Sequence, residues 1–218
     1  MKKMIIIGAG GFGRELLQWI KDINAVKPTW EIAGFIDDNL NALDKIECDY
    51  KIIGTISDWQ PKEDEEFALA LGAPEIKEKI SKMMKQRGAR FPAIIHPTAI
   101  ITPFSTYGEG LVIFPYSKLS VNSCVGDFVT ILSSGVGHDV QIGDYTTISG
   151  MCSVLRNVTI GKRVFLAAGV SLAQDVIIGD DVYIGLGSVV LKDIKQNARV
   201  FGNPARVMPK YKNFSRII

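Results

Sequence analysis

Residues 136–190 decide the fold, and they read VGHDVQ IGDYTT ISGMCS VLRNVT IGKRVF LAAGVS LAQDVI IGDDVY IGLGSV V when they are divided into groups of six. An aliphatic residue opens every group, and a small or branched residue stands four positions later. A period of six matches neither the spacing of an α-helix nor the alternation of a hairpin sheet. It is typical of a parallel β-helix, in which each group forms one side and one corner of a triangular coil. The alternative, a β-sandwich of short strands, would give longer and less regular spacing.

The same period extends toward the N-terminus with one irregularity. Apolar residues lie six apart up to Ile131, but Val136 follows after five residues. A local break in a strand array re-aims the side chains beside it, as a β-bulge does. His138 comes directly after this break. We therefore predict a left-handed parallel β-helix over residues 93–195, with one coil whose outline differs from the others.

Residues 1–92 follow a different pattern, in which strand and helix signals alternate. A short apolar run at 4–7 ends in GAGGFG at 8–13, and apolar residues at helical spacing follow. Alternating strands and helices predict a parallel sheet with helices on its faces. We therefore predict a Rossmann-like α/β domain over 1–92, ahead of the β-helix, and a separate C-terminal tail over 196–218.

The glycine-rich turn predicts a binding site for a phosphate group. Gly8, Gly10 and Gly13 have the G-x-G-x-x-G spacing between a strand and a helix, and Asp37 stands at the end of the next strand. Such a turn brings a phosphate close to backbone N–H groups at a helix N-terminus, and the acid can accept hydrogen bonds from ribose or base. The α/β region is about half as long as a dinucleotide domain, which favours one nucleotide-like ligand over NAD. Two alternatives remain, a tight turn without a ligand and a dehydrogenase that uses the same turn.

His138 is the residue best suited to proton transfer. Of the two histidines, His96 stands at the expected domain boundary, where we predict a structural role. An imidazole with its ordinary pKa of ~6.5 can accept a proton from an amine or a hydroxyl at neutral pH. Asp139 either orients the ring or caps the turn, and the sequence leaves both interpretations open. No Ser or Cys stands in a recognisable activation motif, so direct attack by the acceptor is the simpler mechanism.

Composition narrows the classes of function. The chain has 218 residues and a net charge of +2, which gives no electrostatic basis for nucleic acid or an anionic membrane as the main partner. No apolar run is long enough for a membrane span or a signal peptide. The three cysteines have neither metal-ligand spacing nor a disulfide framework. We expect a cytoplasmic protein without a metal.

The α/β module, the His-Asp pair within a hexapeptide coil and a terminal Gly-Asn-Pro-Ala at 202–205 together resemble one family. They are similar to the bacterial nucleotide-sugar N-acetyltransferases of the bacillosamine and perosamine type, hexapeptide-repeat acyltransferases with an N-terminal Rossmann-like domain. Sialic acid O-acetyltransferases share this layout. The resemblance implies that the α/β domain binds a nucleotide-linked deoxy-amino sugar through the three glycines and Asp37.

The resemblance also implies a role for the coil. Acetyl-CoA, or another acyl-CoA, would bind between two subunits of a homotrimer, near Thr147, Arg156 and Ala168. His138 would be the general base, with Asp139 at the position of its acidic neighbour. The chain departs from the family pattern at several positions. Phe12 stands where a His is common, and Gly72-Ala73-Pro74 with Lys77 stand where Gly-Asn-Asn and then Arg are usual. Ile131-Leu132-Ser133 stand where an Asn is common, and Arg156 stands where a Gly is usual.

The predicted function is N-acylation of the amino group of that sugar in surface glycan biosynthesis. An O-acetyltransferase acting on a sugar of the sialic acid type is the first alternative. A non-catalytic β-helix that binds nucleotides is an alternative of another class.

Overall fold

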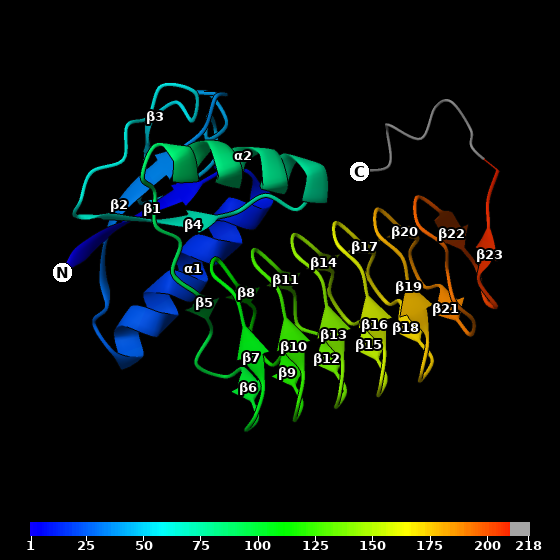
Figure 1. The fold of residues 1–218 in the computed structure, drawn as a ribbon. Helices are drawn as coiled ribbons and strands as arrows, with labels where there is room; N and C mark the ends of the chain where they lie inside the picture. The colour runs from blue at the N-terminus through cyan, green and yellow to red at the C-terminus, as the bar shows by residue number, and fades with distance from the viewer. Residues whose placement is uncertain (210–218) are drawn as a thin grey trace.

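The computed structural model describes residues 1–209 and consists of a small α/β part seated on one end of a long triangular prism (Figure 1). The α/β part contains β1 (Lys2–Ile7), α1 (Gly11–Val26), β2 (Trp30–Ile36), β3 (Ile52–Gly54), β4 (Glu65–Leu69) and α2 (Pro74–Gln86). Its four strands are parallel in the order β3-β2-β1-β4. This arrangement confirms the predicted Rossmann-like module.

The prism is a left-handed parallel β-helix with three sides, as predicted. The first side consists of β5 (Ile94–Ile95), β8 (Val112–Ile113), β11 (Thr130–Ile131), β14 (Thr147–Ile148), β17 (Phe165–Leu166), β20 (Tyr183–Ile184) and β22 (Arg199–Phe201), closed by the antiparallel β23 (Arg206–Val207). The second side consists of β6 (Ile100–Ile101), β9 (Lys118–Leu119), β12 (Gly135–Val136), β15 (Ser153–Val154), β18 (Ser171–Leu172) and β21 (Val189–Val190). The third side consists of β7 (Thr106–Tyr107), β10 (Cys124–Val125), β13 (Gln141–Ile142), β16 (Thr159–Ile160) and β19 (Ile177–Ile178).

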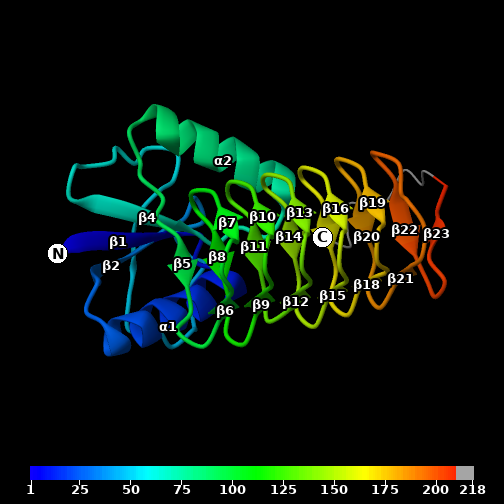
Figure 2. The ribbon, with the colours of Figure 1, turned by 60° about the horizontal axis from the view of Figure 1, so that its bottom comes forward.

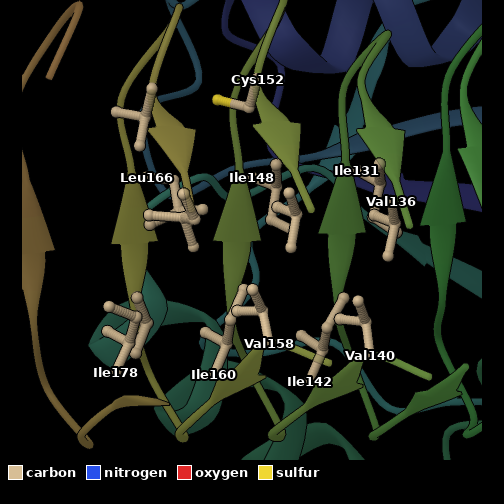
Figure 3. Packing of buried hydrophobic residues seen from close by; sticks show 14 of the residues in the cluster. Ile131, Val136, Val140, Ile142, Ile148, Cys152, Val158, Ile160, Leu166 and Ile178 are labelled. Atoms are coloured by element: carbon tan, nitrogen blue, oxygen red, sulfur yellow. The ribbon is translucent and has the colours of Figure 1, made fainter. Parts of the chain in front are cut away.

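The second residue of each short strand points to the axis and forms the core. Figure 3 shows Ile131, Val136 and Ile142, one from each side, packed among the same residues of neighbouring coils. From Ile113 to Val190 every residue of the predicted six-residue series is buried. Tyr107 differs, with 44% exposure, because its strand β7 is the end strand of the third side.

The break in the period lies at the corner between β11 and β12. Residues 132–134 form this corner, whereas four residues separate the strands at the other corners between 94 and 190. One residue at most corners has a left-handed backbone, a conformation that Asn and Asp tolerate. At the corner between the second and third sides these residues are Phe104 in the first coil and then Asn122, Asp139, Asn157 and Asp175.

The α/β part lies against the N-terminal coils of the prism (Figures 1 and 2), and shared apolar clusters join the two parts. Leu16 and Ile20 of α1 belong to one apolar cluster with Val112 and Phe114 of the first coils. Phe91 and Phe128 link the other face of the small sheet to the prism. The two parts therefore form one packed body. No helix within residues 1–209 is long and apolar enough to cross a membrane.

Candidate active site

His138 lies at the corner that follows β12, with 48% of its side chain exposed. Its Nδ1 atom is 2.6 Å from Oδ2 of Asp139. Because an ionised carboxylate only accepts hydrogen bonds, this contact places the ring proton on Nδ1 and the lone pair on Nε2. The structure gives Nε2 no partner among residues 1–209. His138 therefore presents a free basic nitrogen at an open corner.

The Asp139 carboxylate is itself held in place. Its backbone is left-handed, with φ of 58°, and its Oδ1 accepts a hydrogen bond of 3.1 Å from Nδ2 of Asn122. The hydrogen bond from His138, followed by that from Asn122, lowers the pKa of the Asp139 carboxyl below its ordinary value. Of the two roles that the sequence left open for Asp139, the geometry favours orienting the ring. Asn122 was not predicted, although it occupies the position of Asp139 one coil earlier.

The predicted glycines have different roles. Gly8 has φ of 101°, and a Cβ at Gly13 would lie 1.9 Å from the Gly8 carbonyl oxygen, so the turn itself requires both. A Cβ at Gly10 would meet nothing within 4 Å. Asp37 accepts a hydrogen bond of 2.8 Å from the Ala9 N–H and therefore holds the turn in shape. Open space at Gly10, before the first N–H groups of α1, is the feature that suits a phosphate.

An open cavity of about 730 Å³ lies beside this turn. It is lined by Gly11, Phe12, Arg14, Glu15, Gln18, Trp19 and Leu132. Six of these residues belong to the start of α1, whereas Leu132 belongs to the shortened corner of the prism. The Phe12 ring packs 5.6 Å from Phe114, which makes one wall apolar. The nucleotide-type turn and the irregular coil thus share one cavity.

The three residues expected near CoA lie in three different places. Arg156 is exposed at the corner of His138, one coil further on, and its side chain is 3.6 Å from Asp175. Ala168 lies at the opposite edge of the second side, at the corner between β17 and β18. Thr147 is buried on the first side, where its hydroxyl donates to the Gly72 carbonyl at 2.8 Å. Within one chain these residues do not form a common site.

Lys77 is a buried residue whose contacts the sequence did not predict. It lies on α2 with 1% exposure, and its Nζ contacts the hydroxyls of Thr130 at 3.0 Å and Thr147 at 2.8 Å and the carbonyl of Thr146 at 3.2 Å. Burial lowers the pKa of Lys77 well below its ordinary value. This amine fixes α2 to the first side of the prism and explains why Thr147 is covered.

His96 has the structural environment that was predicted. It is buried between α1 and the first coil, with Nε2 3.2 Å from Asp22 and Nδ1 2.9 Å from the Thr98 hydroxyl. Within residues 1–209 no group of three or more His, Cys, Asp or Glu side chains is arranged to hold a metal ion.

Comparison with known proteins gives matches to both parts of the chain. Residues 3–84 match the family described as PglD N-terminal domain, and residues 157–192 match the bacterial transferase hexapeptide family. Over 166 residues, 75% of each chain, the protein is 28% identical to GDP-perosamine N-acetyltransferase of Escherichia coli O157:H7.

Solved structures repeat the same architecture. The acetyltransferase domain of PglB from Neisseria gonorrhoeae FA1090, in complex with acetyl coenzyme A, is 27% identical with a TM-score of 0.84, covering 95% of this chain and 99% of that one. PerB from Caulobacter crescentus, in complex with CoA and GDP-perosamine, is 22% identical with a TM-score of 0.85, covering 96% and 98%. The second likeness concerns the fold alone.

The two family matches show a PglD-type N-terminal domain followed by hexapeptide repeats of the bacterial transferase type. Within this class the relatives confirm the resemblance drawn from the sequence. The chain matches the bacillosamine- and perosamine-type family of bacterial nucleotide-sugar N-acetyltransferases.

Proposed function

We propose that this protein is an acyl-CoA-dependent N-acyltransferase that acetylates the amino group of a nucleotide-linked deoxy-amino sugar in bacterial surface glycan biosynthesis. The observation that carries the proposal is His138, whose Nε2 has no partner within residues 1–209 and lies at an exposed corner while Asp139 holds Nδ1 at 2.6 Å. The relative that is complexed with acetyl coenzyme A supports the acyl donor. The relative named GDP-perosamine N-acetyltransferase supports the acceptor class. Acyl-CoA is a cytoplasmic metabolite, so the reaction would take place in the cytoplasm.

In the proposed reaction the sugar amine attacks the thioester carbonyl carbon. His138 removes the amine proton through Nε2, and the carbon–sulfur bond breaks to release the CoA thiolate, which takes up the proton. The Asp139 carboxylate keeps the Nδ1 tautomer and stabilises the imidazolium in between. Backbone N–H groups of the coil would stabilise the oxyanion of the tetrahedral intermediate.

We assign binding of the nucleotide sugar to residues 1–92, through the turn at Gly8, Gly10 and Gly13 together with Asp37. Residues 93–195 would bind the acyl-CoA. Arg156 stands beside His138 and suits a CoA contact from the same subunit. Thr147 is left out of this site, because Lys77 and Gly72 already occupy its hydroxyl.

The proposed assembly is a homotrimer around an axis parallel to the prism. The cavity at Leu132 and the base at His138 lie at opposite edges of the second side, so one chain does not bring them together. Three copies would place the His138 corner of one subunit beside the Leu132 and Ala168 corner of the next. Exposed apolar side chains line both edges: Tyr116, Met151 and Leu186 on one, and Val121, Leu155 and Leu191 on the other.

The test is release of CoA thiol from acetyl-CoA across a panel of nucleotide-linked amino sugars. We expect turnover with an amino sugar and none with the matching hydroxyl sugar. Turnover with the hydroxyl sugar alone would instead establish the O-acetyltransferase. Absence of thiol release with every acceptor, together with nucleotide binding, would support the non-catalytic module. Sedimentation equilibrium tests the trimer, and an NADH titration tests the dehydrogenase alternative.

A further inference from the structure

The shortened corner between β11 and β12 changes the outline of the prism at one level. The neighbouring coils end there in exposed tips, Tyr116 at 81% and Met151 at 84% exposure, both with left-handed backbone. Ser133 is the corresponding tip of the short corner, with φ of 42°. With three residues in place of four, the chain turns the corner on a shorter path of about one residue, or ~3.3 Å. The corner at Ser133 is therefore recessed between two projecting side chains.

Gly135, which follows this corner, adds to the recess. It is exposed on the outward face of β12, and a Cβ there would meet nothing within 4 Å. Its backbone is not left-handed, so neither packing nor conformation within the chain requires a glycine. Val189 occupies the matching outward position on β21. A glycine inside a strand often marks a place where a ligand or another backbone approaches closely.

The recess and the base belong to the same coil. Leu132 and Gly135 lie at one end of β12, and His138 lies at the corner beyond its other end. In a ring of parallel prisms, equivalent coils stand at equal height. The recess of one subunit then faces His138 of the next at the same level. Leu132 also lines the cavity that begins at the glycine-rich turn.

We propose that the recess formed by Leu132–Gly135 is the passage through which the acceptor end of the nucleotide sugar reaches His138 of the neighbouring subunit. This inference rests on the proposed function and adds a positioning element to it. The missing corner residue makes room for the sugar between Tyr116 and Met151, and Gly135 keeps the path to the base open. The nucleotide itself stays at the turn of α1.

Two variants fill the recess without changing any titratable group. The first inserts one alanine between Leu132 and Ser133, which restores the corner length that the neighbouring coils already have. The second is Gly135→Val, which introduces the residue that β21 carries at the matching position. Thr159→Val, an outward position of β16 on the third side, is the matched control.

The measurements are steady-state kinetics for both substrates, the unfolding temperature and the assembly mass. We expect both recess variants to keep the wild-type fold and mass, and kcat/KM for the nucleotide sugar to fall about 10²-fold with KM for acyl-CoA unchanged, because displacing the acceptor by one residue's width destroys its alignment. Thr159→Val is expected to match the wild type in every measurement.

A folded insertion variant with wild-type kcat/KM for the sugar would overturn the proposal. Loss of acyl-CoA binding in parallel would also overturn it, because the recess would then serve the donor. If the insertion variant does not fold, Gly135→Val decides between the same outcomes. A wild-type protein that transfers no acyl group would count against the proposed function, which separates that failure from a failure of the recess.

Discussion

Replacement of Lys77 tests how α2 is fixed to the prism. The perturbation is a pair of variants, Lys77→Ala and Lys77→Met. Both lose three hydrogen bonds from Nζ, each of which contributes about 1 kcal/mol net. Alanine also removes the buried stem, about three methylene equivalents at ~0.8 kcal/mol each, whereas methionine retains most of that apolar volume. We expect Lys77→Ala to lower the free energy of unfolding by about 3–5 kcal/mol.

The two variants differ in a way that isolates the stem. Because methionine retains most of the buried stem, we expect Lys77→Met to be more stable than Lys77→Ala by about 2 kcal/mol. In a domain of this size that difference raises the unfolding temperature by about 4–8 °C. Relief from burying an amine offsets part of the hydrogen-bond loss in both variants, so it does not change the difference between them.

The pH dependence gives a second, independent signal. Burial lowers the pKa of Lys77 below 10.5, so the unfolded chain binds this proton more tightly than the folded chain does. The free energy of unfolding therefore rises with pH between the lowered pKa and 10.5, and Lys77→Met lacks this contribution. We expect the stability of the wild type relative to Lys77→Met to increase through that window.

The assay is thermal unfolding followed by circular dichroism over a pH series, at fixed protomer concentration because assembly contributes to stability. Equal unfolding temperatures for the alanine and methionine variants would refute burial of the stem. A difference between wild type and Lys77→Met that does not change with pH would refute burial of the amine.

Further predictions concern the site. His138→Ala is expected to lower kcat by about 10²–10⁴-fold without changing the unfolding temperature, and near-normal turnover in the thiol-release assay would contradict its role. Asp139→Asn keeps a neighbour for the ring but no longer fixes the tautomer, so kcat in the same assay should fall and stay above that of His138→Ala. Gly13→Ala would place a Cβ 1.9 Å from the Gly8 oxygen and should prevent folding of the α/β part, seen as loss of its helical circular dichroism signal. Gly10→Ala has open space and should fold, with weaker binding of the nucleotide sugar by calorimetry.

The periodic parts of the fold were predictable from sequence because each coil repeats the same local requirements. Each side of the prism needs one residue toward the axis, and this residue recurs every six positions from Ile113 to Val190. The break at Ile131–Val136 was visible for the same reason, since a regular pattern makes one missing residue evident. It also pointed to His138, whose pairing with Asp139 depends on adjacent residues alone.

The contacts between distant segments were not predictable in the same way. Lys77 has the sequence appearance of a solvated helix residue, and its burial depends on how α2 lies against Thr130 and Thr147, more than fifty positions away. The sequence also does not reveal that α2 covers Thr147, because this contact joins distant segments. Thr147 was therefore expected near CoA. The edge of the prism that Ala168 occupies follows from the number of corners that precede it, and this edge is opposite to that of Arg156.

The β-helix also fixes the distance between sites on different coils in multiples of one turn. Strand partners along the third side are eighteen residues apart, as in Ile142 with Ile160. The exception is the pair Cys124 and Gln141, where the short corner makes the step seventeen. Because α1 and α2 are packed against the early coils, adding or deleting one full turn before His138 would shift the base relative to the glycine-rich turn by about 4.8 Å and would preserve the packing of coil on coil. Related sequences can therefore change the reach between their two ligands by gaining or losing entire turns, and loop length is a poor guide to that reach.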